Sequence, residues 1–167
     1  MTAGFVAAGL LASCSYEPSV VPAYLFILDA PDGEIIEGTA GFELVLPADQ
    51  KVTWFTDRPL RQAGTIDLSD LAATWEADGF IAVPPQAALD LFVDGSDETF
   101  VVELGAPRLD GDSYFFPLSD VQLEDTSMVP EHAGRTATMD VVAGQHEEIS
   151  MFINSTNSCS ICEVTGA

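Results

Sequence analysis

Two arginines, Arg58 and Arg61, lie within one eleven-residue stretch, WFTDRPLRQAG, at residues 54–64. The whole chain has 5 basic and 27 acidic residues, so this stretch holds a large share of its positive charge. Two guanidinium groups near Trp54 could bind a carboxylate, sulfate or phosphate and stack on a ring. The stretch therefore predicts an anion-binding candidate site at Arg58, Arg61 and Trp54, whose field would stand out on an acidic protein.

A structural role for the same stretch is the favoured interpretation. Asp57 and Arg58 could form an ion pair that fixes the connection between a strand and the following helix. Thr56 could cap the turn that Pro59 enforces. Under this interpretation Arg61, further along the loop, is the arginine expected to remain available to a ligand.

Acidic residues also gather at predicted turns, and calcium binds oxygen cages of this kind in extracellular proteins. The weak calcium candidates are Asp94, Asp97, Glu98, Asp110 and Asp112. The stronger interpretation is turn chemistry, because Asp-Gly pairs favour tight reversals. Calcium is therefore a minor possibility, and no other cofactor is expected.

No catalytic residue is predicted. The sequence lacks a G-x-S-x-G motif, and His132 and His146 both lie in polar, loop-like surroundings. Whether the chain is an enzyme stays open, with the balance against it. The alternative is a hydrolase-like enzyme with an anion-binding site at Arg58 and Arg61.

The N-terminus bears on location. Residues 1–13 are apolar or small and uncharged, and Leu11-Ala12-Ser13-Cys14 resembles the lipobox of bacterial lipoproteins, although no Lys or Arg lies near Met1. The resemblance implies a signal peptide at residues 1–13, lipidation at Cys14 and a tether over residues 14–22. It implies an exported envelope protein, lipid-anchored or else periplasmic or extracellular.

Lipidation of Cys14 would leave an even pair of cysteines, Cys159 and Cys162. Their spacing predicts a local disulfide in an oxidising compartment. Zinc binding with His132 and His146 is a less favoured alternative, because zinc would need two ligands besides the cysteines.

Composition limits the possible partners. The chain has 167 residues, 47% of them hydrophobic, which suits a single domain with a substantial core over residues 23–167. A net charge of -22 argues against nucleic-acid binding and predicts repulsion from anionic membrane surfaces. Membrane attachment is expected only through lipid, and a protein partner, self-association or a small anionic ligand remains possible.

The elements that would position these residues are mostly strands. Alternating apolar residues predict strands over 24–29, 42–47, 51–56 and 147–154, with a turn at 31–34 after the first. Residues 88–93 and 100–104 predict a hairpin, and residues 68–75 a helix with Asp67 as its N-cap. The expected fold is mainly β, an antiparallel β-sandwich or barrel with one short helix.

Residues 52–107 also resemble a known pattern. F-T-D-R-P, then A-G, a short helix ending in Trp, and later P-P and V-V-E-L are similar to a loose family of small exported bacterial proteins of uncharacterised function. Gln86 stands where that pattern has Asn. The resemblance implies an exported β-rich domain and supplies no activity.

Together these observations predict a non-enzymatic, exported binding or structural protein of the cell envelope. A self-assembling surface protein is a third possibility, because a long strand such as 88–93 could offer an edge for strand addition.

Overall fold

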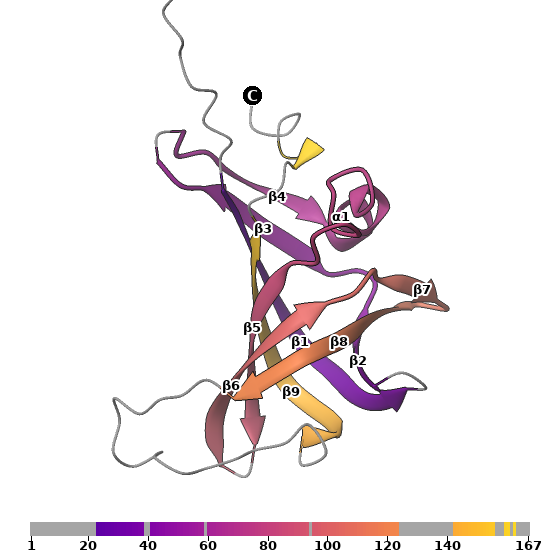
Figure 1. Cartoon of the computed structure of the whole chain (residues 1–167). Coiled ribbons are helices and arrows are strands. Elements are labelled where there is room, and N and C mark those ends of the chain that lie inside the picture. The colour runs from indigo at the N-terminus through magenta and orange to yellow at the C-terminus, as the bar shows by residue number, and fades with distance from the viewer. Residues whose placement is uncertain are drawn as a thin grey trace, which may run out of the picture.

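The computed structural model describes residues 23–38, 41–58, 60–93, 95–123, 142–155, 159–160 and 162. Strands dominate them, with one short helix (Figure 1). The elements are β1 (Tyr24–Gly38), β2 (Gly41–Pro47), β3 (Lys51–Thr56), β4 (Ala63–Asp67), α1 (Leu68–Thr74), β5 (Gln86–Val93), β6 (Ser96–Leu104), β7 (Arg108–Asp110), β8 (Ser113–Leu123) and β9 (Gly144–Ser155).

Six of the strands form a closed antiparallel barrel. Their order is β1-β2-β8-β6-β5-β9, and β9 returns to β1 to complete the circle. β3 and β4 extend the sheet from β1, and β7 pairs with β8. The predicted fold class is confirmed, and it takes the barrel form. Closure satisfies both edges of the six barrel strands, which an open sheet would leave unpaired.

The length of β1 allows one strand to serve both parts of the sheet. Residues 24–28 pair with β3, whereas residues 34–38 pair with β2. The expected turn at residues 31–34 is wrong, because the strand continues through them.

Gly33, within that expected turn, has a packing role. A Cβ atom there would lie 2.6 Å from Ile149 Cδ1 and 2.8 Å from Leu46 Cδ2. The glycine therefore permits neighbouring side chains to approach the β1 backbone closely.

Apolar side chains fill the barrel interior. Along β9, Ile149, Met151 and Ile153 alternate with more exposed residues, as period-2 patterning requires. The largest contributors from the other barrel strands, each at most 1% exposed, are Phe26, Leu28, Ile35, Leu44, Leu46, Leu89, Leu91, Phe100, Val102, Leu104 and Phe116. Small barrels are usually packed solid in this way. A binding site of this protein is therefore expected on the outer surface or in the loops.

Helix α1 and the turns after it cover one end of the barrel. Leu68 and Leu71 are buried, as predicted, and Trp75 packs against Phe80 and Phe116 with ring centroids 4.8 and 6.1 Å away. The buried aromatic rings join the helical segment to the barrel core.

Asp67 occupies the predicted N-cap position with an extended backbone, but its side chain makes no capping hydrogen bond. Its carboxylate accepts a hydrogen bond from Lys51 on the paired strand β3 instead. The helix start is thus fixed by a cross-strand ion pair and by the hydrogen bond from the Leu68 N–H to the Gln50 carbonyl, 3.0 Å long.

Candidate functional site

We call the turn between β3 and β4, residues 57–62, the hairpin tip; Pro59 within it lies outside the described residues. Thr56 holds its base: its N–H donates to the Gln62 carbonyl, and its hydroxyl accepts from the Gln62 N–H, both at 2.9 Å. Within the tip the Arg61 N–H donates to the Asp57 carbonyl at 3.1 Å, and Arg61 has a φ of 52°. Thr56 is buried, and its two hydrogen bonds to Gln62 fix the base of the tip. The described side chains beyond it are exposed.

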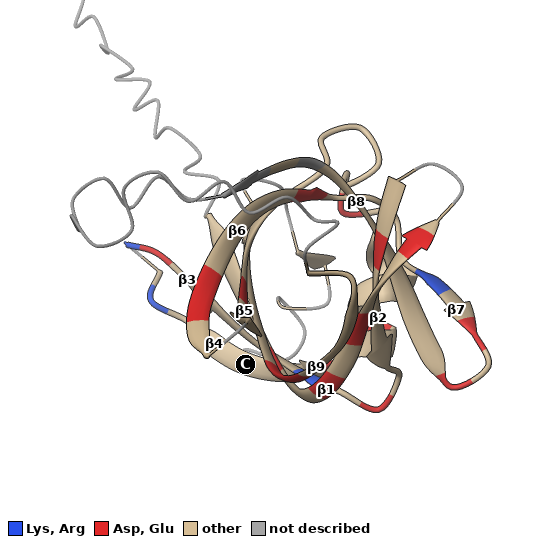
Figure 2. Cartoon of the chain, turned by 90° about the horizontal axis from the view of Figure 1, so that it is seen from below, with Lys and Arg blue, Asp and Glu red and all other residues tan. Residues whose placement is uncertain are grey.

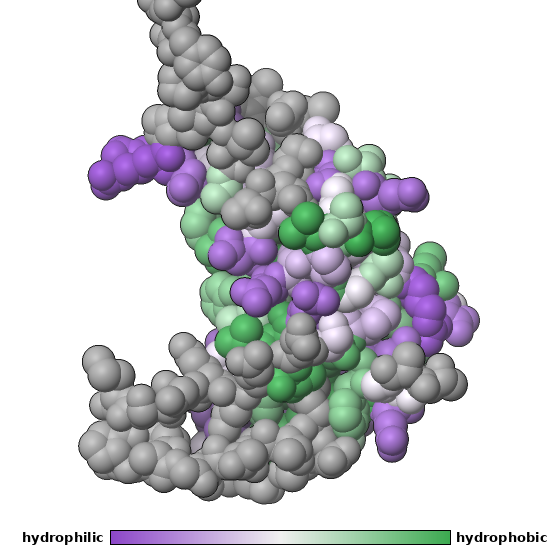
Figure 3. All heavy atoms as spheres, viewed as in Figure 1, coloured by the Kyte–Doolittle hydropathy of each residue, from purple (hydrophilic) through white to green (hydrophobic). Residues whose placement is uncertain are grey.

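The exposed side chains that the structure describes at the hairpin tip are Asp57, Arg58, Leu60, Arg61 and Gln62. Arg58 and Arg61 are exposed, and Leu60 between them is 49% exposed. Figure 2 shows basic residues (blue) in the connection between β3 and β4. Figure 3 shows hydrophilic atoms projecting from the body of the protein on the side where Figure 1 places this hairpin. The tip therefore presents two cations, one carboxylate and an aliphatic group on a projecting turn.

The other basic residues that the structure describes are neutralised. Lys51 pairs with Asp67, and Arg108 lies 3.0 Å from a Glu43 oxygen and 3.6 Å from an Asp110 oxygen. Neither Arg58 nor Arg61 has a salt bridge to any carboxylate among the described residues. The hairpin tip is thus where positive charge is left uncompensated in this part of the chain.

The expected ion pair of Asp57 with Arg58 does not appear in this geometry. Both side chains are exposed, and no salt bridge joins them. The base of the β3–β4 hairpin is held by the two hydrogen bonds of Thr56 and not by an ion pair. Arg58 is consequently as available to a ligand as Arg61, although the sequence favoured Arg61 alone.

Trp54 belongs to the core and cannot take part in ligand stacking at the hairpin tip. It is 0% exposed, and its ring centroid lies 6.1 Å from that of Tyr24. Alternation along β3 turns Val52, Trp54 and Thr56 inward. The apolar member of the candidate site is Leu60, which sequence reasoning missed although it stands between the two arginines.

The five acidic residues considered for calcium divide between two turns. Asp94, Asp97 and Glu98 belong to the β5–β6 hairpin, and Asp110 and Asp112 to the β7–β8 hairpin. Asp94 lies outside the described residues. Within the described part of the chain, no three His, Cys, Asp or Glu side chains come together as a metal site would require.

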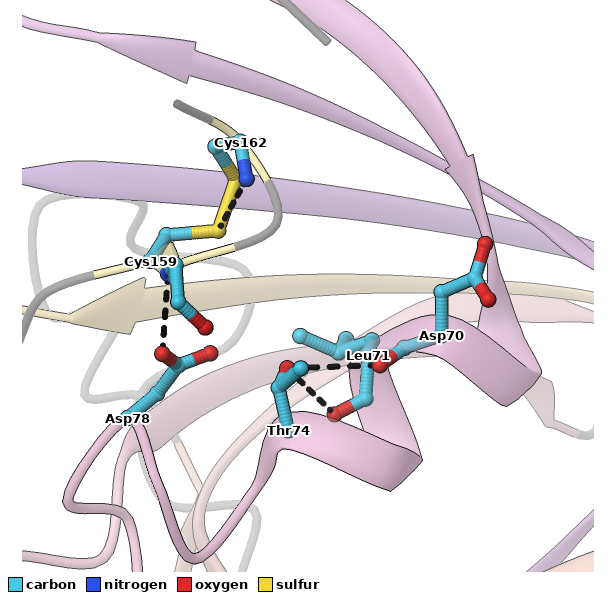
Figure 4. Close-up of a disulfide and its surroundings, with 7 residues drawn as sticks. Asp70, Leu71, Thr74, Asp78, Cys159 and Cys162 are labelled. Carbon is cyan, nitrogen blue, oxygen red and sulfur yellow. Dashed lines mark hydrogen bonds between the residues drawn. A yellow bond between two sulfur atoms is a disulfide. The ribbon is translucent and has the colours of Figure 1, made fainter. Parts of the chain in front are cut away.

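Cys159 and Cys162, which the sequence predicts to be a local disulfide, are joined as one, with their Cα atoms 5.3 Å apart. Both are buried, and the disulfide packs over the segment that follows α1 (Figure 4). The zinc alternative does not fit this arrangement, because zinc binds cysteine as the thiolate. His146 lies on β9 with Nε2 2.6 Å from the Val142 carbonyl oxygen, whereas Cys14 and His132 lie outside the described residues.

The strand considered for edge pairing, residues 88–93, is an inner strand over its first half, whereas residues 91–93 pair with β6 alone. Residues 88–90 of β5 pair with β6 on one side and with β9 on the other. Among the described strands, β4 and β7 each pair on one side only. Strand addition along a whole strand in this part of the chain would therefore use β4 or β7.

In the described part of the chain, no helix has both the length and the apolar character needed to cross a bilayer. The resemblance of residues 52–107 to small exported proteins stays a prediction. No protein-family model, curated protein or solved structure matches the chain.

Proposed function

We propose that this chain is a non-enzymatic binding module of the bacterial cell envelope, exported and anchored by lipid at Cys14, and that its hairpin tip binds anionic groups. The observation that carries the proposal is the pair of exposed arginines without a carboxylate partner among the described residues. Lys51 and Arg108 have such partners, in a chain with 27 acidic residues. The tip also carries the exposed carboxylate of Asp57, which forms no salt bridge with either arginine, so its local charge is +1 (2 − 1).

Energetics supports recognition of an anion at this position. An exposed ion pair contributes about 0.2–1 kcal/mol, and a guanidinium group can make two parallel hydrogen bonds to one phosphate or carboxylate, so both arginines together are needed for appreciable binding. Because the hairpin tip projects from the body (Figure 3), a partner can approach both arginines, with Asp57 as the acidic residue of the tip itself.

The exposure of Arg58 and Arg61 to solvent favours a binding role for them over a catalytic role. Electrostatic stabilisation of a transition state is strongest where water is excluded. Arg58 and Arg61 are exposed on a convex turn, which suits association with a larger surface. The buried Cys159–Cys162 disulfide supports export, because disulfides persist in oxidising compartments.

Binding of fluorescein-labelled dextran sulfate by the purified full chain, followed by fluorescence anisotropy, tests the role of the hairpin tip. The variant R58A/R61A removes the tip cations, and K51A/R108A removes two cations that are already paired. Both variants change the net charge from -22 to -24, since each loses two positive charges. We expect R58A/R61A to weaken binding by at least tenfold and K51A/R108A by less than twofold. Equal losses in the two variants would show that net charge alone controls binding.

Lipid anchoring has its own test. Cys14→Ala is expected to move the protein from the membrane fraction to the soluble fraction of the cell envelope, because an acyl chain supplies the attachment. Cys14→Ala protein that stays with the membranes would contradict this part of the proposal.

Self-association is a second candidate, and the free side of β4 is the observation that favours it. An unpaired strand edge can accept a further strand from another copy. The chain carries -22 charges, so association should require screening by salt or calcium. Analytical ultracentrifugation at low salt, at high salt and with calcium tests this candidate, and a monomer under all three conditions rules it out.

A further inference from the structure

The hairpin tip lies next to the point where the N-terminal segment enters the barrel. The Asp57 N–H donates to the Ala23 carbonyl at 3.3 Å, and Tyr24 pairs with Thr56 across β1 and β3. The β5–β6 turn lies at the opposite end of the protein (Figure 1). A membrane anchor attached through the N-terminal segment would therefore join the protein at the same end that carries Arg58 and Arg61.

The tether limits how far this end can move from an anchored lipid. From Cys14 to Ala23 the chain advances nine residues (23 − 14 = 9). Nine residues span at most roughly 30 Å even when fully extended. The tether therefore keeps the hairpin tip within reach of the headgroup layer, although it does not by itself hold the tip against that layer.

From these observations we infer that the hairpin tip rests on anionic phospholipid headgroups of the membrane that holds the lipid anchor, with the acidic body of the barrel directed away from it. The inference rests on the proposed lipid anchoring at Cys14. It names the partner of the anion-binding tip as a lipid surface.

The side chains of the tip match such a surface. Arg58 and Arg61 suit phosphate groups, which guanidinium binds in a bidentate manner. Leu60 is exposed between them and can enter the boundary between headgroups and acyl chains, whereas a small soluble anion would leave it in water. Asp57 is also exposed at the tip and opposes the contact, so the tip has a local charge of +1 (2 − 1).

The basic residues of the tip and the acidic residues of the body together orient the protein relative to an anionic membrane. Each basic residue near an anionic leaflet favours the contact by roughly fivefold. The body is repelled, but this repulsion fades beyond about 8 Å at physiological ionic strength. A free protein would gain little from so weak a contact, whereas a tether raises the effective concentration of the tip at the surface to the order of millimolar.

Site-specific quenching tests the orientation. The lipidated full chain is incorporated into vesicles of phosphatidylcholine with phosphatidylglycerol, and Gln62→Cys at the tip is labelled with the polarity-sensitive dye NBD. Asp97→Cys, which labels the exposed β5–β6 hairpin, is the matched control. We expect brominated lipids to quench the dye at position 62 but not at position 97. Adding R58A/R61A should lower the ratio of contacting to free tip by roughly 25-fold, two factors of five, whereas adding R108A should leave it unchanged.

The outcomes separate this inference from the proposed function. Protein that floats with vesicles while position 62 remains unquenched keeps the anchor and overturns the orientation. Quenching at both positions, equal quenching in pure phosphatidylcholine, or no effect of R58A/R61A also overturns it. If dextran sulfate still binds the tip in these cases, the anionic partner is soluble and the proposed binding role stands. Protein that does not float at all removes the anchor and the inference together.

Discussion

Removal of the Cys159–Cys162 disulfide is expected to lower the free energy of unfolding by more than the entropy of closing a short loop accounts for. Asp78, in the turns after α1, is only 2% exposed, and its Oδ1 accepts a hydrogen bond of 2.8 Å from the Ser160 N–H. Its Oδ2 has no hydrogen-bond partner among the described residues. A buried carboxylate thus depends on a donor that lies inside the disulfide loop (Figure 4).

The expected magnitude has two parts. Closing a loop of four residues, 159–162, stabilises the folded state by about 2 kcal/mol in the chain-entropy treatment. Loss of the hydrogen bond to the buried Asp78 carboxylate adds about 1.5–3 kcal/mol. The variant C159A/C162A should therefore lower the free energy of unfolding by about 3.5–5 kcal/mol. In an Asp78→Ala background only the first part remains, so the coupling should be about 1.5–3 kcal/mol.

Urea unfolding of the four proteins of this double-mutant cycle, followed by tryptophan fluorescence, measures the coupling. The lost packing of the sulfur atoms enters both backgrounds and cancels. Asp70→Ala is the matched control, because Asp70 lies on the neighbouring helix α1 and its side chain points away from the disulfide in Figure 4. The control cycle should show a coupling below about 0.5 kcal/mol, as for independent sites. A coupling for Asp78 as small as that for Asp70 would refute the reasoning.

Two further predictions concern the fold. A Cβ atom at Gly64 would lie 2.8 Å from Trp54 Nε1, so Gly64→Ala should cost about 1–3 kcal/mol in thermal denaturation, whereas the exposed Thr65→Ala should be nearly neutral. Equal stability of these two variants would contradict the close packing of β3 on β4. Maleimide labelling of denatured, non-reduced protein should leave Cys159 and Cys162 unmodified, and labelling without prior reduction would show that they are not paired.

Local patterning predicted the elements whose exposure alternates strictly. The strand at residues 147–154 and the hairpin formed by residues 88–93 and 100–104 both appear in the structure, because one face of each meets the core. Strand β4 was missed, since Thr65 and Ile66 favour a strand but Ala63, Gly64 and Asp67 are residue types that are depleted in strands. It forms because Gly64 lets the strand lie against the Trp54 ring of β3.

Closure of the barrel depends on long-range pairing, which a local pattern does not contain. Pro31 and Gly33 look like a turn in isolation, yet the strand passes through them because β9 pairs along its length. The same difficulty affected the candidate site. Proximity in sequence correctly drew attention to Arg58 and Arg61, but it also included Trp54, which the alternation of β3 places in the core.

The central claim is that the hairpin tip is the anion-binding surface of this protein. Amide chemical shifts of the ¹⁵N-labelled full chain, titrated with inorganic pyrophosphate against sodium chloride of equal ionic strength, test it most directly. We predict shifts confined to the amides of residues 57, 58 and 60–62 and to Ala23, whose carbonyl accepts a hydrogen bond from the Asp57 N–H. Shifts centred on Arg108, or spread evenly over the barrel, would contradict it.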